Sequence, residues 1–353
     1  MKSRTLYFTA PNQIEIREQA LPALKDDEAL VETICSAISA GTEMLIYRGQ
    51  FPHLKDSHDN LSSDLNYPFV YGYACVGIVK ELGKDVDKSW HDKLVFGFQP
   101  HSSHFIAQTS DLIPAPTSSD GTIPLSAEAC SFLPNMETAV NLIHDGAPLL
   151  GERVLVLGQG IVGLLVASVL KEFPLKRLIT SDNYALRRKA SLDLGVDDCF
   201  DPKDLNIDVD VSLSKSSQST LNADIDYAQK MDLTFELSGS PSALNNALAM
   251  TNFSGRVVIG SWYGEKKANI DLGGSFHRSR IKLISSQVST ISPELSGRWD
   301  KARRFEFAWE ALKRIQPQKW ITHRFPIENA RKAYQLLDEN PQETIQVIFE
   351  YKS

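Results

Sequence analysis

The stretch Arg153-Val154-Leu155-Val156-Leu157-Gly158-Gln159-Gly160-Ile161-Val162-Gly163 decides the fold. Its apolar beginning predicts a buried strand, the motif GxGxxG follows, and the apolar residues beyond it predict a helix. In such a turn Gly158 permits the tight bend, Gly160 lets the backbone approach a pyrophosphate, and Gly163 allows close helix-to-strand packing. The helix start at Ile161 and Val162 offers N–H donors and a positive dipole end. The stretch therefore predicts a dinucleotide-binding α/β domain.

Asp182 indicates which dinucleotide is bound. It follows the next predicted strand, 178–181, at the distance expected for a carboxylate that binds a ribose. The carboxylate would accept hydrogen bonds from a free ribose diol and repel a 2'-phosphate, which favours NAD(H) over NADP(H). Arg187 and Arg188 could instead reach a phosphate, although arginines at an exposed helix start more often face water.

Outward from this motif the pattern changes along the chain. The first 125 residues are rich in short β-like runs separated by Gly, Pro and Asp, whereas helices and strands alternate from Ser126 onward. The predicted strands are 29–34, 77–82, 153–157, 177–180, 233–237, 256–259 and 344–350. The predicted helices lie between 126 and 144, from 161 onward, at 303–315 and at 327–337. The Asp- and Ser-rich segment 201–222 predicts a solvated connection.

Composition limits the class of partner. The chain has 353 residues, 42% hydrophobic and 23% charged, which predicts two globular domains. A net charge of -7 argues against binding to nucleic acid or an anionic membrane, so we expect a small-molecule substrate. We expect a cytoplasmic protein, because no signal peptide is visible and glycines interrupt the longest apolar stretch. The four cysteines are far apart, which predicts buried, reduced thiols.

The chain resembles the medium-chain dehydrogenase/reductase superfamily over essentially its whole length. The resemblance lies in Gly158 to Gly163, in Gly41-Thr42-Glu43, in Pro68 to Gly77 and in the C-terminal helix and strand. It implies a Rossmann doubly wound parallel sheet, 126–289, inserted into a GroES-like, mostly β catalytic domain, 1–125 completed by 290–353. It also implies an active site in the cleft between the domains and a homo-oligomer, either dimer or tetramer. The segments that resemble the bacteriochlorophyllide dehydrogenase branch are Ile38 to Glu43, Tyr47-Arg48-Gly49, Tyr67-Pro68 and Gly72-Tyr73.

The superfamily's zinc ligands are replaced in this chain. Zinc members have a Cys before the Gly41-Thr42-Glu43 segment, a Gly-His-Glu triplet, and a later Cys or Glu. Here Ala40 takes the first position, Gly72-Tyr73-Ala74 replaces the triplet, and only Cys130 stands where a third ligand would be. One thiol cannot make a three-ligand catalytic site. We therefore expect no metal, and proton transfer then requires an organic acid or base.

Four side chains are candidates for that acid or base. The resemblance places Thr42 at the family's hydroxyl-relay position and Tyr73 where a zinc-bound histidine would point into the cleft. Glu43 corresponds to a carboxylate that orients neighbours or forms a structural ion pair. His101 is expected at the rim of the pocket, where an imidazole suits proton transfer near neutrality, and Phe98 is expected to line the pocket. Tyr73 could also be an aromatic that merely fills the vacated metal site.

Further cofactor neighbours follow from the same resemblance. Thr138 lies at the start of the helix that packs beneath the nicotinamide in family members. Ser238, Gly260 and Ser261 follow predicted strands of the Rossmann half and are expected to face NAD(H) through backbone and small side chains.

Three functions fit these features. The first is reversible hydride transfer between NAD(H) and a secondary alcohol or ketone without zinc. The second is reduction of quinones or enoyl groups with NAD(P)H, and the third is a non-catalytic nucleotide-binding scaffold. The sequence does not identify the substrate, and sugars, cyclitols and tetrapyrroles all stay open.

Overall fold

The computed structural model describes residues 1–51, 66–117, 121, 124–204 and 230–352, so most of the predicted connection at 201–222 lies outside the described residues. The chain divides into two units. The first contains Met1–Thr138, Gly264–Lys266 and Pro293–Ser353, and the second contains Ala139–Tyr263 and Lys267–Ser292. Each unit is described by itself.

The second unit is built on a parallel sheet. Its strands are β9 (Arg153–Leu157), β10 (Arg177–Ser181), β11 (Asp198–Phe200), β12 (Met231–Glu236), β13 (Thr251–Ile259) and β14 (Lys282–Ser285). They pair in the order β11-β10-β9-β12-β13-β14, and each of these pairings is parallel. Its helices are α4 (Ile161–Leu170), α5 (Ala185–Asp193) and α6 (Ala243–Met250). The strand order reverses between β9 and β12, the switch point at which doubly wound sheets bind ligands.

The turn after β9 depends on its glycines. Residues 154–157 of β9 are buried, as expected for a parallel strand covered on both faces. Gly158 then adopts a φ of +93°, which favours glycine. A Cβ on Gly163 would lie 1.9 Å from the carbonyl oxygen of Gly158, so only glycine lets α4 approach β9 this closely.

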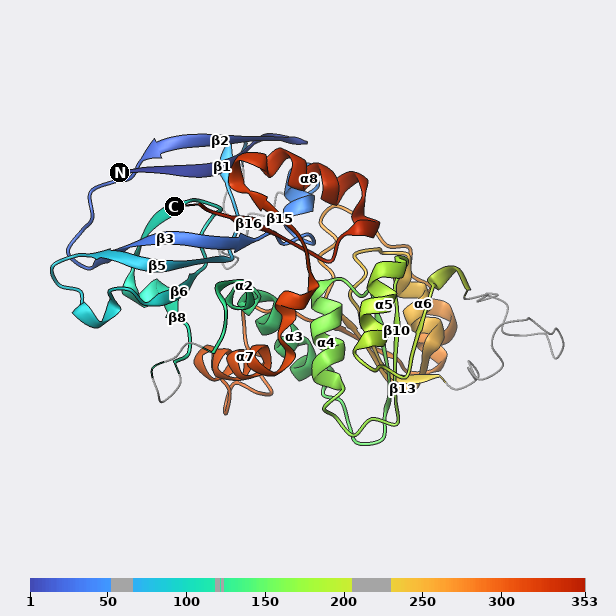
Figure 1. The fold of residues 1–353 in the computed structure, drawn as a ribbon. Helices are drawn as coiled ribbons and strands as arrows, with labels where there is room; N and C mark the ends of the chain where they lie inside the picture. Colours follow the sequence, from blue (N-terminus) through green and yellow to red (C-terminus); the bar gives the residue numbers. More distant parts are fainter. Residues whose placement is uncertain (52–65, 118–120, 122–123, 205–229, 353) are drawn as a thin grey trace. The chain divides into compact units, whose positions relative to one another are not determined.

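The first unit is mostly antiparallel β-structure. Its strands are β1 (Lys2–Ala10), β2 (Gln13–Ala20), β3 (Glu28–Ala37), β4 (Phe69–Val70), β5 (Cys75–Leu82), β6 (Leu94–Gly97), β7 (His104–Gln108), β8 (Leu112–Pro114), β15 (Ile321–Pro326) and β16 (Gln346–Glu350). The larger sheet has the order β15-β16-β3-β5-β6-β8, with β7 also on β3 (Figure 1). In the pairing of β16 with β3, Ile348 lies opposite Ala37. Segments far apart in sequence therefore form one sheet.

The helices of the first unit are α1 (Glu43–Tyr47), α2 (Ala127–Cys130), α7 (Lys301–Ile315) and α8 (Ala330–Glu339), and α3 (Leu133–Gly146) crosses the division between the units. An aromatic group fixes α8. The Tyr334 ring meets Phe8 edge to face at 5.4 Å and stacks with Tyr47 at 5.4 Å. These contacts hold the buried phenol of Tyr334 beside α1.

The predicted α/β class is confirmed, with a Rossmann-type parallel sheet and an antiparallel β domain. Strand β9 has the predicted bounds, whereas the predicted helix 327–337 starts as a 3-10 turn and becomes α-helical at Ala330. The prediction of four buried thiols is wrong for Cys199, which is only partly buried, although all four cysteines are free. None of the described helices has the length and hydrophobicity that a bilayer crossing requires.

We expect Gly163→Ala to lower the free energy of unfolding by about 1–3 kcal/mol, because the new methyl group overpacks the contact between α4 and Gly158. Gly160→Ala is the matched control, since the nearest atom to its Cβ would be 3.9 Å away, on Arg187. Urea unfolding of the two variants checks this expectation. Equal losses at both positions would contradict it.

Candidate active site

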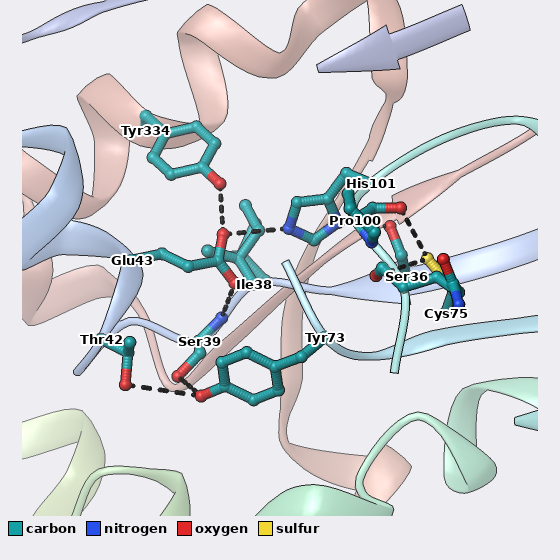
Figure 2. A network of polar contacts seen from close by, with 12 residues as sticks. Ser36, Ile38, Ser39, Thr42, Glu43, Tyr73, Cys75, Pro100, His101 and Tyr334 are labelled. Atoms are coloured by element: carbon teal, nitrogen blue, oxygen red, sulfur yellow. Dashed lines mark hydrogen bonds and ion pairs between the residues drawn. The ribbon is translucent and has the colours of Figure 1, made fainter. Parts of the chain in front are cut away.

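Three hydroxyl side chains meet in the first unit, where β3 leads into α1. The phenol of Tyr73 donates a hydrogen bond to Ser39 Oγ and lies 3.5 Å from Thr42 Oγ1 (Figure 2). Thr42 is the N-cap residue of α1, but its side chain makes no capping hydrogen bond. Burial raises the pKa of the Tyr73 phenol, and the hydrogen bonds to Ser39 and Thr42 oppose that rise. Tyr73 is therefore a neutral, protonated group near pH 7.

A buried carboxylate lies behind these hydroxyls. Glu43 is fully buried, and its Oε1 accepts a 2.8 Å hydrogen bond from the backbone N–H of Ser39. Its Oε2 accepts from His101 Nε2 at 2.9 Å and from the phenol of Tyr334 (Figure 2). All three partners are donors, the arrangement that satisfies an ionised carboxylate. Glu43 thus accepts three hydrogen bonds in the interior, and its expected role in orienting neighbours or in a structural ion pair stays a prediction.

The network continues on the far side of the His101 ring. His101 Nδ1 lies 2.7 Å from Ser36 Oγ, and Ser36 Oγ lies 2.8 Å from the phenol of Tyr351. Burial raises the pKa of both Tyr334 and Tyr351 well above the usual tyrosine value. These phenols therefore act as neutral hydrogen-bonding groups that hold the network in place.

The expected position of His101 at a pocket rim is wrong. The side chain is fully buried, and its backbone carbonyl accepts a 3.0 Å hydrogen bond from Leu6 N–H. Gly72 leaves room for the ring, because a Cβ there would lie 2.9 Å from His101 Cδ2. Contacts with residues distant in sequence thus bring the loop into the core. A role for His101 in proton transfer stays a prediction.

The positions at which the resemblance expects zinc ligands hold a poor donor set. Ala40 has no donor atom, and Tyr73 presents a neutral phenol in place of an imidazole. Cys130 is fully buried, and burial raises the pKa of its thiol to about 12, which disfavours the thiolate that zinc binds. In the described part of the chain, no group of three His, Cys, Asp or Glu side chains is arranged to hold a metal. These residues do not fit a catalytic zinc.

Phe98 lies apart from this network. Its ring meets Phe96 edge to face at 4.9 Å and lies 6.2 Å from Phe305, while 42% of the residue is exposed. The exposed ring is an apolar surface, and its role in a substrate pocket stays a prediction.

The second unit has a turn suited to a dinucleotide. Asp182 is buried, and its two oxygens accept the backbone N–H groups of Gln159 at 2.7 Å and Tyr184 at 2.8 Å. Each oxygen keeps a lone pair for a further donor, such as a ribose hydroxyl. A Cβ on Gly160 would lie 3.9 Å from Arg187 Nη1, an ordinary van der Waals distance, so the backbone there is not crowded. The Arg188 guanidinium donates hydrogen bonds to Asp201 Oδ2 at 2.9 Å and to the backbone, so it already has partners within the protein. The residues fit a dinucleotide.

The other predicted cofactor neighbours take different positions. Thr138 donates its hydroxyl to Pro134 O at 2.9 Å within α3, and Ser261 Oγ accepts from Gly239 N–H at 2.9 Å. Gly260 is a packing position, because a Cβ would lie 2.5 Å from Leu142 Cδ2. Ser238 is exposed at the end of β12.

Sequence reasoning missed four polar residues of the Glu43 network: Ser36, Ser39, Tyr334 and Tyr351. Ser39 lies in the segment Ile38 to Glu43, three residues before Thr42, so the sequence alone could have indicated that the two hydroxyls are close. The others are brought to their partners by tertiary structure alone.

Comparisons with known proteins agree with this fold. Residues 162–305 match the family model described as zinc-binding dehydrogenase. The starvation-sensing protein RspB of Escherichia coli K12 is 22% identical over 377 residues, covering 99% of each chain. The L-idonate 5-dehydrogenase (NAD(P)(+)) of the same organism is 24% identical over 248 residues, 69% of this chain and 62% of the relative. The structure of a short chain alcohol dehydrogenase (rspB) from E. coli CFT073 with NADH has a TM-score of 0.76 and 18% identity, with 99% of both chains covered.

Together these comparisons show a match to the zinc-binding dehydrogenase family model over residues 162–305 and a fold shared with a solved dehydrogenase over 99% of the chain.

We expect Glu43→Ala to lower the free energy of unfolding by about 3–5 kcal/mol, because it leaves a buried imidazole, a phenol and a backbone N–H without their acceptor. Glu18→Ala, which breaks an exposed ion pair with Lys2, is expected to leave stability almost unchanged. Urea unfolding measures both. Similar stability of the two variants would show that the Glu43 network carries no such energy.

Proposed function

We propose that the protein is a zinc-independent, NAD(H)-dependent oxidoreductase that interconverts a secondary alcohol and a ketone. The observation that carries this proposal is the hydroxyl cluster of Tyr73, Ser39 and Thr42, which includes a residue that the resemblance expects in the position of a zinc ligand. The family model and relatives named as alcohol and L-idonate dehydrogenases support the reaction class. We also propose a zinc-lacking branch like that of bacteriochlorophyllide dehydrogenase, a cytoplasmic location and a homo-oligomer.

When bound, the nicotinamide donates or accepts the hydride. The chain's own residues then handle the proton at the substrate oxygen. In ketone reduction, the Tyr73 phenol donates its proton to that oxygen as negative charge develops there. Ser39 and Thr42 lie close enough to relay a proton from solvent water back to the Tyr73 oxygen, so that both hydroxyls end the cycle protonated. Glu43 holds the Ser39 backbone in place through its 2.8 Å hydrogen bond.

The raised pKa of Tyr73 gives the proposed reaction a pH dependence. A neutral phenol is a proton donor but a poor base, so near pH 7 Tyr73 is in the form that ketone reduction requires. Alcohol oxidation requires the phenolate, whose share rises with pH. Oxidation is therefore expected to accelerate as the pH increases toward the tyrosine range.

A spectrophotometric screen tests the reaction class. NAD+ with alcohols, and NADH with ketones, quinones and enones, would be followed by the nicotinamide absorbance. Turnover of alcohols and ketones supports the proposal. Turnover of enones or quinones alone would replace it with an enoyl or quinone reductase, and binding without any turnover would indicate a scaffold.

We expect NAD(H) to bind more tightly than NADP(H), because the buried charge of Asp182 repels a 2'-phosphate. Asp182→Asn removes the charge while keeping an oxygen for the Gln159 or Tyr184 N–H. It should therefore narrow the difference between the NAD(H) and NADP(H) affinities. Calorimetry of all four cofactor forms measures this preference. Equal or tighter NADP(H) binding by the unaltered protein would overturn the assignment.

We expect Tyr73→Phe to keep NAD(H) affinity but to lower turnover by roughly 10²–10⁴-fold, the usual contribution of a general acid or base. Tyr7→Phe is a matched control in the first unit, since the Tyr7 hydroxyl contacts only Gln19 among the hydrogen bonds of the described residues. Activity of the unaltered protein should also survive a chelator. If Tyr73→Phe and Thr42→Val both turn over normally while chemistry limits the rate, the proton takes another route, and His101 is next to be tested.

A further inference from the structure

The second unit contains a buried carboxylate that the proposed mechanism does not use. Glu236 is the last residue of β12 and is fully buried. Its Oε1 accepts the Ser238 backbone N–H at 2.8 Å and the Ser238 hydroxyl, and its Oε2 accepts the Tyr263 phenol. Among the described residues no Lys, Arg or His forms an ion pair with it. Glu236 therefore brings a negative charge that three neutral donors solvate and no cation cancels.

The three partners are held firmly around this carboxylate. Burial raises the pKa of the Tyr263 phenol, and the hydrogen bond and charge of Glu236 add to the rise, so Tyr263 stays a neutral donor. Gly260 N–H donates to the backbone carbonyl of Glu236 at 3.0 Å, which fixes the end of β12 against β13. The carboxylate is therefore fixed in position at the ends of these two strands.

The topology places Glu236 in one half of the dinucleotide site. It lies at the carboxyl end of β12, immediately across the switch point from the Gly158 turn after β9. The two turns touch, because a Cβ on Gly158 would lie 2.7 Å from Ser238 Cα. Asp182, after β10, marks the half that holds the adenosine ribose. In a doubly wound sheet the second mononucleotide lies on the opposite side, over β12 and β13.

We infer that Glu236 is a positioning residue whose charge favours binding of the oxidised, positively charged nicotinamide over the reduced, neutral ring. The inference rests on the proposed function, since it requires a nicotinamide cofactor. Oxidised and reduced rings differ by one unit of charge but hardly in shape. A fixed buried charge therefore changes the ratio of the two affinities, whereas a loss of shape or stability changes both affinities together. At an effective dielectric constant near 20, a unit charge within about 10 Å of the ring would change that ratio by roughly tenfold or more.

The experiment measures the dissociation constants of NAD+ and NADH by calorimetry at one pH and ionic strength. In Glu236→Gln, the ratio of the NAD+ to the NADH dissociation constant should rise at least about fivefold. Asp232→Asn is the matched control. It removes the same charge from the same strand, but four residues and therefore about 13 Å away from Glu236 along the strand. The Arg153 N–H, which donates to Asp232 Oδ2 at 2.9 Å, still has an oxygen to bond to in this variant. The ratio for Asp232→Asn should change clearly less than the ratio for Glu236→Gln in the same titrations, because the Coulomb energy falls with distance.

An unchanged ratio in Glu236→Gln, with both nucleotides still bound, overturns the inference and leaves the proposed function standing. Failure of the unaltered protein to bind either nucleotide overturns the proposed function, and the inference with it. If Glu236→Gln does not fold, Ser238→Lys replaces it, because it places an ammonium group beside the carboxylate at an exposed position. The same rise in the ratio supports the inference, and an unchanged ratio overturns it.

Discussion

The first unit depends on the hydrogen bonds that the buried carboxylate of Glu43 accepts. The carboxylate is fully buried, and it is satisfied only when a backbone N–H, the His101 ring and the Tyr334 phenol all reach it. Because an unsatisfied buried charge is so unfavourable, these segments are held in one arrangement. The same carboxylate fixes the backbone of Ser39, and through Ser39 it fixes the hydroxyl that meets Tyr73. Local chemistry at the candidate site is thus set by long-range packing.

A hydroxyl cluster and a metal ion handle a substrate proton differently. A metal lowers the pKa of the bound oxygen itself, whereas Tyr73 has its own pKa raised by burial and stays protonated. The site therefore offers a proton more readily than it accepts one. In the second unit, Glu236 contributes a fixed negative charge at the opposite side of the switch point from Asp182.

The fold was predictable where neighbouring residues determine it. Strand β9 and its glycine turn follow from a continuous apolar run and a motif within eleven residues, and both appear at the predicted positions. The proximity of Tyr73 to Thr42 was expected only from the resemblance, because no rule of sequence spacing brings together residues that are 31 apart. The burial of His101 depends on Leu6 and Glu43, and the contact of Glu236 with Tyr263 joins residues 27 apart. Such contacts carry no local signal, so they required the tertiary structure.

The pairing of β16 with β3 has a consequence for how the protein is made. Residues 35–37 of β3 are translated early, but their partners in β16 are residues 348–350, near the other end of the sequence. Tyr351, which reaches Ser36, comes just after β16. The strands of the second unit are all translated before β16, so that unit is able to fold while the sheet of the first is still open. This part of β3 therefore has no β16 partner during synthesis, and an unpaired strand edge is a segment that chaperones are able to bind.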